Sequence, residues 1–281
     1  MNLFFRRPLQ CLFAVVFVGL LSACGASSTV DPFKPTRVVG LGDGYNDATA
    51  TVDDATSTRT VVGQMASYFG QSNLISKGRA GAKVADLSSQ INDVVTNNGG
   101  FSSGDLVVIA VGTFDIKDGT NPDAAAQVLL EQVQRLKAAG VKHILVMPVL
   151  DLNRTPWGIA NPGLVNASAT GTFNEAVLLA FNTAFGGQTP NTVIFANASG
   201  VSSLFLTATS VTTYSPFTDT GFGGTLPACG SVTSFTGCVA GGAGVNTNYP
   251  TMLFANGIHL TPAGNRWVAG YLYNATAQGW R

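Results

Sequence analysis

Short apolar segments alternate with longer segments of helical periodicity along most of the chain. The apolar segments are rich in Val, Ile or Leu and are bounded by Gly, Asn or Pro, which is typical of buried strands. We predict strands over residues 37–41, 105–111, 141–148 and 192–196, and a weaker one over 73–76. Apolar positions at helical spacing predict helices over 61–68, 84–95, 122–139, 173–185 and 262–277.

This alternation predicts a parallel sheet, because parallel neighbours are joined by crossover helices. Right-handed crossovers place helices on both faces of the sheet. The predicted fold class is therefore α/β: a three-layer α/β/α sandwich with a parallel, flavodoxin-like sheet of about five strands, formed as one domain by residues 36–281. We interpret the glycine-rich segment 221–244 as a surface loop of this domain.

The first residues have the pattern of an export signal. Arg6 and Arg7 precede an apolar run of about 13 residues, which is shorter than the roughly 20 residues of a membrane-spanning helix. The run ends in Leu21-Ser22-Ala23-Cys24, which resembles the lipobox of bacterial lipoproteins. The resemblance implies a signal peptide over 1–23, a lipid on Cys24 that binds the membrane, and a tether over 24–35.

In proteobacterial lipoproteins an aspartate after the lipidated cysteine retains the protein at the inner membrane. Here Gly25 follows Cys24, so the resemblance favours the outer membrane. Ordinary secretion to the periplasm or beyond, with cleavage after a small residue and no lipid, is the alternative.

The remaining cysteines agree with export. Cys11 lies in the predicted signal peptide and Cys24 carries the predicted lipid, so Cys229 and Cys238 are left in the mature chain. An exported protein reaches a compartment that permits disulfides. We predict that these two cysteines form a local disulfide, which stabilises the fold by roughly 2 to 3 kcal/mol.

Composition excludes several classes of partner. Fifteen basic and fifteen acidic residues cancel, so no basic surface is expected for nucleic acid. The chain has two histidines, and no cysteine pair has the spacing of zinc ligands. We expect no metal site and no cofactor.

The loop after the first strand, Gly42-Asp43-Gly44-Tyr45-Asn46-Asp47, lies where parallel sheets bind ligands. As a phosphate-binding loop it has its glycines at the wrong spacing, and no acidic residue completes a dinucleotide site. It also resembles the magnesium motif of haloacid dehalogenase-type phosphatases. Those enzymes need an Asp-x-Asp-x-Thr strand upstream, whereas the nearest match, Asp118-Gly119-Thr120, is downstream and has Ile116 at the nucleophile position.

A third interpretation accounts for the whole chain. Four blocks, in order, resemble those of the SGNH, or GDSL, hydrolases: Gly42 to Asp47, Arg79 to Ala82, Val111 to Asp115, and Asn256 to Gly264. The stretch from Ala138 to Pro148 and the Cys229/Cys238 pair resemble the outer-membrane and autotransporter-like esterases of that group. The resemblance spans Arg37 to Leu272 and implies an ester hydrolase whose Asp43 and Asp47 brace the first loop.

The chain departs from this family at the groups that do the chemistry. Gly44 stands at the serine nucleophile, Phe114 at a side-chain oxyanion donor and Asn256 at the aspartate that orients the histidine. Gly81, as a backbone oxyanion donor, and His259 remain. Losing these groups costs about 10⁶, about 10² to 10³ and about 10⁴ in turnover respectively, not additively. Ester hydrolysis by the usual route should be abolished.

Other groups offer weak substitutes. Tyr45 has a phenol of pKa near 10 that needs a base. Ser102 matches a Gly-x-Ser-x-Gly pattern but lacks the strand before it and the helix after it. We expect His143 to be structural, and the Phe114 ring to turn into a void above Gly44.

These observations predict a lipid-anchored envelope protein whose SGNH-like domain has a binding or accessory role, with an acyl or sugar ligand. The alternative is an active esterase or lipase that uses His259 and a non-standard nucleophile. A phosphatase of the haloacid dehalogenase type is a third hypothesis.

Overall fold

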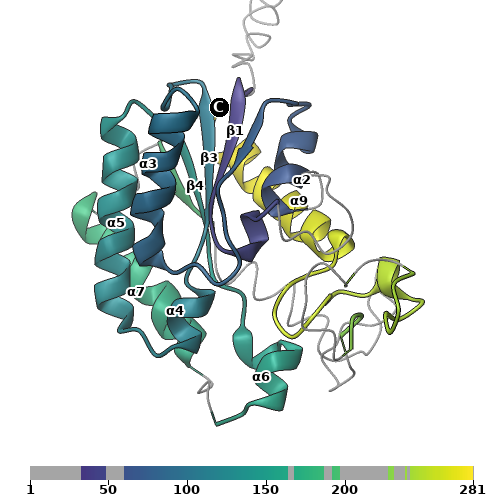
Figure 1. The fold of residues 1–281 in the computed structure, drawn as a ribbon. Helices are drawn as coiled ribbons and strands as arrows, with labels where there is room; N and C mark the ends of the chain where they lie inside the picture. Colours follow the sequence, from purple (N-terminus) through teal and green to yellow (C-terminus); the bar gives the residue numbers. More distant parts are fainter. Residues whose placement is uncertain are drawn as a thin grey trace, which may run out of the picture. The chain divides into compact units, whose positions relative to one another are not determined.

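The fold is a sheet of five parallel strands with helices on both faces (Figure 1), seen in a computed structural model. The structure describes residues 33–48, 60–163, 168–186, 192–196, 227–230, 238 and 241–280. The strands are β1 (Arg37–Gly42), β2 (Leu74–Ser76), β3 (Asp105–Ala110), β4 (His143–Met147) and β5 (Val193–Phe195). Their spatial order is β2-β1-β3-β4-β5, which confirms the predicted fold class.

The helices form two outer layers. Those on one face are α3 (Leu87–Asn97), α5 (Pro122–Ala138) and α7 (Ala169–Ala184), and those on the other are α2 (Val61–Tyr68) and α9 (Pro262–Gly279) (Figure 1). Shorter elements are α4 (Thr113–Lys117), α6 (Pro156–Ala160), η1 (Gly44–Asn46), η3 (Val84–Asp86), η4 (Leu152–Arg154) and η6 (Tyr249–Thr251). No helix in the described residues is long and apolar enough to cross a membrane.

The strands are buried on both faces, which explains their continuous apolar sequences. Alternate residues, including Val39, Val107 and Ile144, pack against the α3, α5 and α7 layer. On the other face α2 approaches β1 closely, because a Cβ at Gly40 would lie 2.7 Å from Cγ1 of Val62. Glycine at this position lets the helix rest directly on the strand.

A buried charge network ties the amino ends of β1 and β3. The Arg37 guanidinium donates to both Asp105 carboxylate oxygens and to the carbonyls of Asn98 and Gly100, just after α3. The Ser102 hydroxyl and amide donate to the same carboxylate. Since Asp105 is fully paired, its charge is compensated inside the fold.

Most predicted elements are confirmed to within a few residues. The predicted helix over 84–95 is divided into η3 and α3, and α7 begins at Ala169 instead of residue 173. The five-residue helices α4 and α6 were not predicted, because one turn carries too little periodicity.

The predicted surface loop over 221–244 lies partly outside the described residues; of the described ones, 241, 243 and 244 are exposed. Cys229 and Cys238 are buried in a small apolar cluster with Ala228, Tyr249, Met252 and Ala255. The two sulfurs are joined, and the cystine is part of this cluster. Residues 1–32, with the predicted signal peptide and Cys24, lie outside the described residues.

Candidate active site

The candidate site lies at the carboxyl ends of β1 and β3. From β1 the chain continues to β2 on one side, and β3 lies on the other side of β1. Parallel α/β sheets commonly bind ligands at the carboxyl ends of the strands where the strand order reverses in this way. Gly44 follows β1 in η1, and Phe114 follows β3 in α4. His259 reaches the same place from the loop just before α9. The fold thus brings together the first, third and fourth blocks found in the sequence, and the second is hydrogen-bonded to the first.

Buried amides hold the loop that carries Gly44. The Gln90 side chain accepts a hydrogen bond from the amide of Gly42 (2.6 Å) and donates to its carbonyl (2.9 Å). The Asn46 amide group donates to the carbonyls of Leu41 (2.8 Å) and Val108 (3.0 Å). The ends of β1 and β3 are therefore fixed without any contribution from residue 44.

Asp47 joins this loop to the second block. Its Oδ2 accepts from the amide of Ala80 at 2.9 Å, and the Arg79 amide donates to the Gly42 carbonyl at 2.9 Å. Asp47 is buried, in keeping with the bracing role that the resemblance implies. Gly81 follows in an exposed turn with a φ of 89°. Its role as an oxyanion donor stays a prediction.

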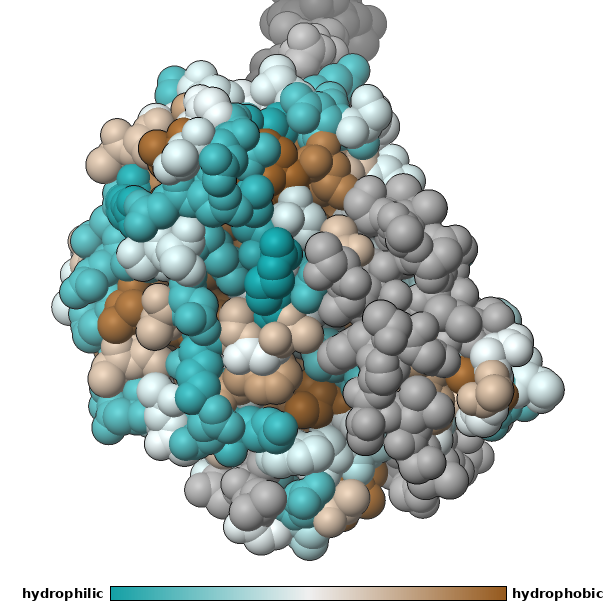
Figure 2. Space-filling view, viewed as in Figure 1, coloured by the Kyte–Doolittle hydropathy of each residue, from teal (hydrophilic) through white to brown (hydrophobic). Residues whose placement is uncertain are grey.

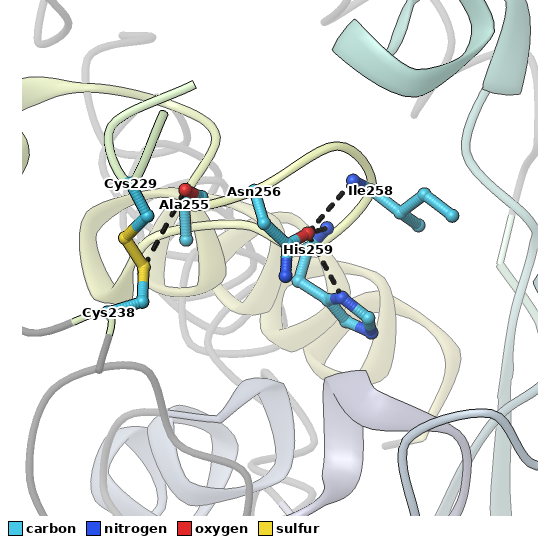
Figure 3. Close-up of a disulfide and its surroundings, with 6 residues drawn as sticks. All are labelled: Cys229, Cys238, Ala255, Asn256, Ile258 and His259. Carbon is cyan, nitrogen blue, oxygen red and sulfur yellow. Dashed lines mark hydrogen bonds between the residues drawn. A yellow bond between two sulfur atoms is a disulfide. The ribbon is translucent and has the colours of Figure 1, made fainter. Parts of the chain in front are cut away.

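Asn256 orients His259 although it carries no charge (Figure 3). Its Oδ1 accepts from the amides of Ile258 (3.0 Å) and His259 (2.8 Å) and lies 3.2 Å from the His259 Nδ1. The two amides identify this atom as the oxygen, and an oxygen accepts only, so Nδ1 must carry the proton. The lone pair of the imidazole is then on Nε2.

The disulfide lies next to the start of the same loop, beside Ala255 (Figure 3). Cys229 and Cys238 are bonded, with their Cα atoms 5.4 Å apart, as the sequence predicts. The amide of Cys229 donates to the Ala255 carbonyl (2.8 Å), and the amide of Ala255 donates to the His259 carbonyl (2.9 Å). The cystine is thus connected to the histidine loop through one residue.

The imidazole of His259 occupies the volume above Gly44. A Cβ at residue 44 would lie 2.3 Å from Nε2 and 2.6 Å from Cδ2 of that ring, far inside van der Waals contact. The predicted void above Gly44, filled by Phe114, is therefore wrong. Phe114 instead lies beside the imidazole, with ring centroids 6.1 Å apart. The histidine fills the space because no side chain at residue 44 keeps it out.

Burial shifts the titration of the site. It lowers the pKa of His259 to about 4; Lys117 acts in the same direction and Asp47 opposes it. Burial likewise raises the pKa of Asp43 to about 7, with the neighbouring Asp115 adding to the shift. At neutral pH the imidazole is uncharged, and the Asp43 carboxyl keeps its proton to a much higher pH than an exposed aspartate does.

The hydroxyls of the other candidate nucleophiles are bonded to other groups. The Tyr45 ring lies near the imidazole of His259, with ring centroids 6.0 Å apart. The Tyr45 hydroxyl donates to the Ile258 carbonyl (3.2 Å), and burial raises the pKa of this phenol. Ser102 lies at the amino end of β3, bonded to Asp105, at the opposite edge of the sheet from Gly44.

His143 is also at that amino edge, at the start of β4, with its ring edge-on to Trp280 at 5.0 Å. It therefore lies at the opposite end of the strands from Gly44. In the part of the chain that the structure describes, no three His, Cys, Asp or Glu residues are grouped as metal ligands.

Two residues near the site were not identified from the sequence. The Lys117 ammonium lies 5.5 Å from the ring centroids of both Phe114 and Trp157. The amide of Trp157 donates to the carbonyl of Gly257 (2.8 Å), next to the histidine loop. Trp157 is 40 residues beyond Lys117 in the chain, so no local pattern indicated that they meet.

Comparison with known protein families matches residues 38–272 to the family described as GDSL-like Lipase/Acylhydrolase. Among solved structures, the chain is similar to a lipolytic G-D-S-L family protein from Veillonella parvula, with a TM-score of 0.51 and 15% identity over 84% of this chain and 94% of that one. It is also similar to LAE5, an alpha/beta hydrolase enzyme from the metagenome of Lake Arreo, with a TM-score of 0.51 and 14% identity over 86% and 95%. At these identities the likeness shows a shared fold. No curated protein matches the chain.

The overlap at residue 44 predicts coupling between Gly44 and His259. G44A should lower the free energy of unfolding by about 1 to 3 kcal/mol, because its methyl group must displace a buried ring. In an H259A background the same substitution should cost less than about 0.5 kcal/mol, since the ring is gone. Urea unfolding of the four proteins measures both costs, and equal costs in the two backgrounds would refute the overlap.

Stability should depend on pH through Asp43. The pKa of Asp43 is about 7 in the folded chain and about 3.9 when unfolded. Between these values the folded chain holds a proton that the unfolded chain releases, so this group destabilises the fold as the pH rises. Relative to wild type, D43N should therefore gain about 2 to 4 kcal/mol of unfolding free energy between about pH 4.5 and about pH 7.5, measured by urea unfolding.

His259 provides the control of opposite sign. Its folded pKa of about 4 lies below the unfolded value of about 6.5, so acidification through that window favours the unfolded chain. H259N should gain stability relative to wild type as the pH falls. Parallel profiles for D43N and wild type would contradict the assignment to Asp43.

Proposed function

Because the chain belongs to the GDSL-like lipase and acylhydrolase family, we propose a specific departure from it. The protein is a lipid-anchored envelope protein whose SGNH hydrolase-like domain binds a ligand and lacks serine ester-hydrolase activity. The observation that carries this proposal is the contact between Gly44 and the His259 ring. Without a hydroxyl at that position no acyl intermediate forms there.

The surroundings of His259 support the same conclusion. Asn256 holds the ring in the tautomer that a catalytic base needs, but a neutral amide does not stabilise the imidazolium that proton transfer creates. A base works best with a pKa near the operating pH, and burial lowers the pKa of His259 to about 4. Phe114 presents a ring in place of a hydrogen-bond donor. Each change weakens hydrolysis by a different physical route.

One observation favours the second candidate, an esterase or lipase that acts through His259. At neutral pH its imidazole is uncharged and keeps a lone pair on Nε2, so it retains the form that accepts a proton. A non-standard nucleophile or a water molecule would then have to replace the serine. This candidate predicts activity that depends on His259.

The two candidates differ in an ester hydrolysis assay. We expect purified wild-type protein and H259A to release nitrophenol from nitrophenyl acetate and butyrate at the same rate as buffer. Wild-type hydrolysis at least about tenfold above buffer and lost in H259A would overturn the proposal. The combined variant G44S/F114N/N256D serves as the positive control. It restores the serine nucleophile, the side-chain oxyanion donor and the aspartate that orients His259. Its activity, and the loss of that activity with H259A, would show that the blocks still align.

Lipid attachment is tested separately. When the full-length chain is expressed in a Gram-negative host with labelled palmitate, we expect the wild-type protein to carry label and to sediment with outer membranes. C24S should lose both properties, because the thiol that accepts the lipid is gone. C11S should keep both, as Cys11 is removed with the signal peptide. An unlabelled wild-type protein would contradict the anchor.

A further inference from the structure

A cation lies between two aromatic rings at the edge of the candidate site. The Lys117 ammonium is 5.5 Å from the ring centroid of Phe114 and 5.5 Å from that of Trp157. Lys117 is exposed, whereas both rings are half-buried. The ammonium lies over the ring faces, where the electron density attracts a cation.

The charge of Lys117 has no acidic partner. Within the residues that the structure describes, no carboxylate lies at ion-pair distance from its ammonium. The nearby acids are engaged elsewhere: Asp118 pairs with the ammonium of Lys83 at 2.6 Å, and Asp115 accepts from the amide of Val84 at 3.0 Å. Lys117 is thus left able to receive an anion.

The cluster of Phe114, Lys117 and Trp157 borders the His259 loop on two sides. Phe114 lies beside the imidazole, and the Trp157 amide donates to the carbonyl of Gly257. Lys117 is near enough for its charge to lower the pKa of His259. The elements α4 and α6 follow β3 and β4 at the carboxyl edge of the sheet, and Figure 2 shows hydrophobic surface between them.

We propose that Phe114, Lys117 and Trp157 recognise an anionic amphiphile at the His259 site: a carboxylate or phosphate group attached to an apolar body. The ammonium pairs with the anionic group, and the two rings contact the apolar part. A neutral ligand would leave the cation unmatched. The inference rests on the proposed function only in placing the ligand beside His259, since the charge preference does not depend on whether hydrolysis occurs.

The chain contains a matched control for this cluster. The Lys137 ammonium lies 4.5 Å from the ring centroid of Phe185, a similar cation–aromatic pair formed between α5 and the end of α7. Exposed pairs of this kind contribute little to stability. K117M and K137M should therefore have similar, small effects on unfolding, and only K117M removes a charge at the site.

Binding is tested with three eight-carbon probes that differ in their headgroup: octanoate, octyl phosphate and octyltrimethylammonium. Isothermal titration calorimetry below the micelle concentrations should show that wild-type protein binds at least one anionic probe and does not bind the cationic probe. K117M should lose at least about tenfold in affinity, as expected for a charge-assisted contact. K117R should stay within about threefold of wild type, and K137M should be unchanged.

The location of binding is read from the histidine resonances of untagged protein, because the chain has two histidines at opposite edges of the sheet. The anionic probe should shift the His259 signal and leave that of His143 in place. Equal affinity for all three probes, no binding of either anion, or equal affinity of K117M and wild type would overturn the inference.

The ester hydrolysis assay shows whether a negative result refutes the inference about the ligand or the proposed function. A protein that hydrolyses esters but still prefers anions through Lys117 would refute only the proposed function. A protein with neither hydrolysis nor anion binding would refute only the inference about the ligand.

Discussion

The seating of the His259 imidazole over Gly44 is the constraint on which the rest of the site depends. The glycine is not required by its backbone, since its φ is not positive, unlike those of Gly42 and Gly112. It is required by the ring, because a Cβ at residue 44 would overlap Nε2. Each residue therefore makes the position of the other possible, and the ring lies where an acyl-transfer enzyme carries its nucleophile.

The hydrogen bonds that hold the loop around Gly44 do not involve the positions where the family carries its nucleophile, oxyanion donor and orienting aspartate. Gln90, Asn46 and Asp47 hold the loop through buried hydrogen bonds to backbone groups. Removing one of these partners would leave a buried polar group unpaired, which costs about 1 to 3 kcal/mol. Replacing a serine by glycine at residue 44 breaks none of these bonds. The architecture of a hydrolase can thus persist when its nucleophile is absent.

The histidine loop is stabilised from the other side by covalent and backbone links. The cystine is connected through Ala255 to His259, and Asn256 satisfies two backbone amides as well as the ring. An amide oxygen can do this without bringing a negative charge into a buried site, which would be costly to desolvate. The imidazole stays neutral, and the Lys117 ammonium lies at the rim near two aromatic rings.

The sequence by itself determined the fold class, most strands and helices, the four blocks and the cysteine pair. These features depend on local periodicity and on residue identity, and both are readable without neighbours from elsewhere in the chain. It also indicated correctly that Ser102 lacks the strand before it that a nucleophile elbow requires, since Ser102 precedes β3. Only the tertiary structure decided that His259, and not Phe114, fills the space above Gly44. It likewise decided that Lys117 meets Trp157 and that Cys229 is buried. These outcomes depend on which side chains pack into the same volume, and that is decided by contacts between segments that are distant in the chain.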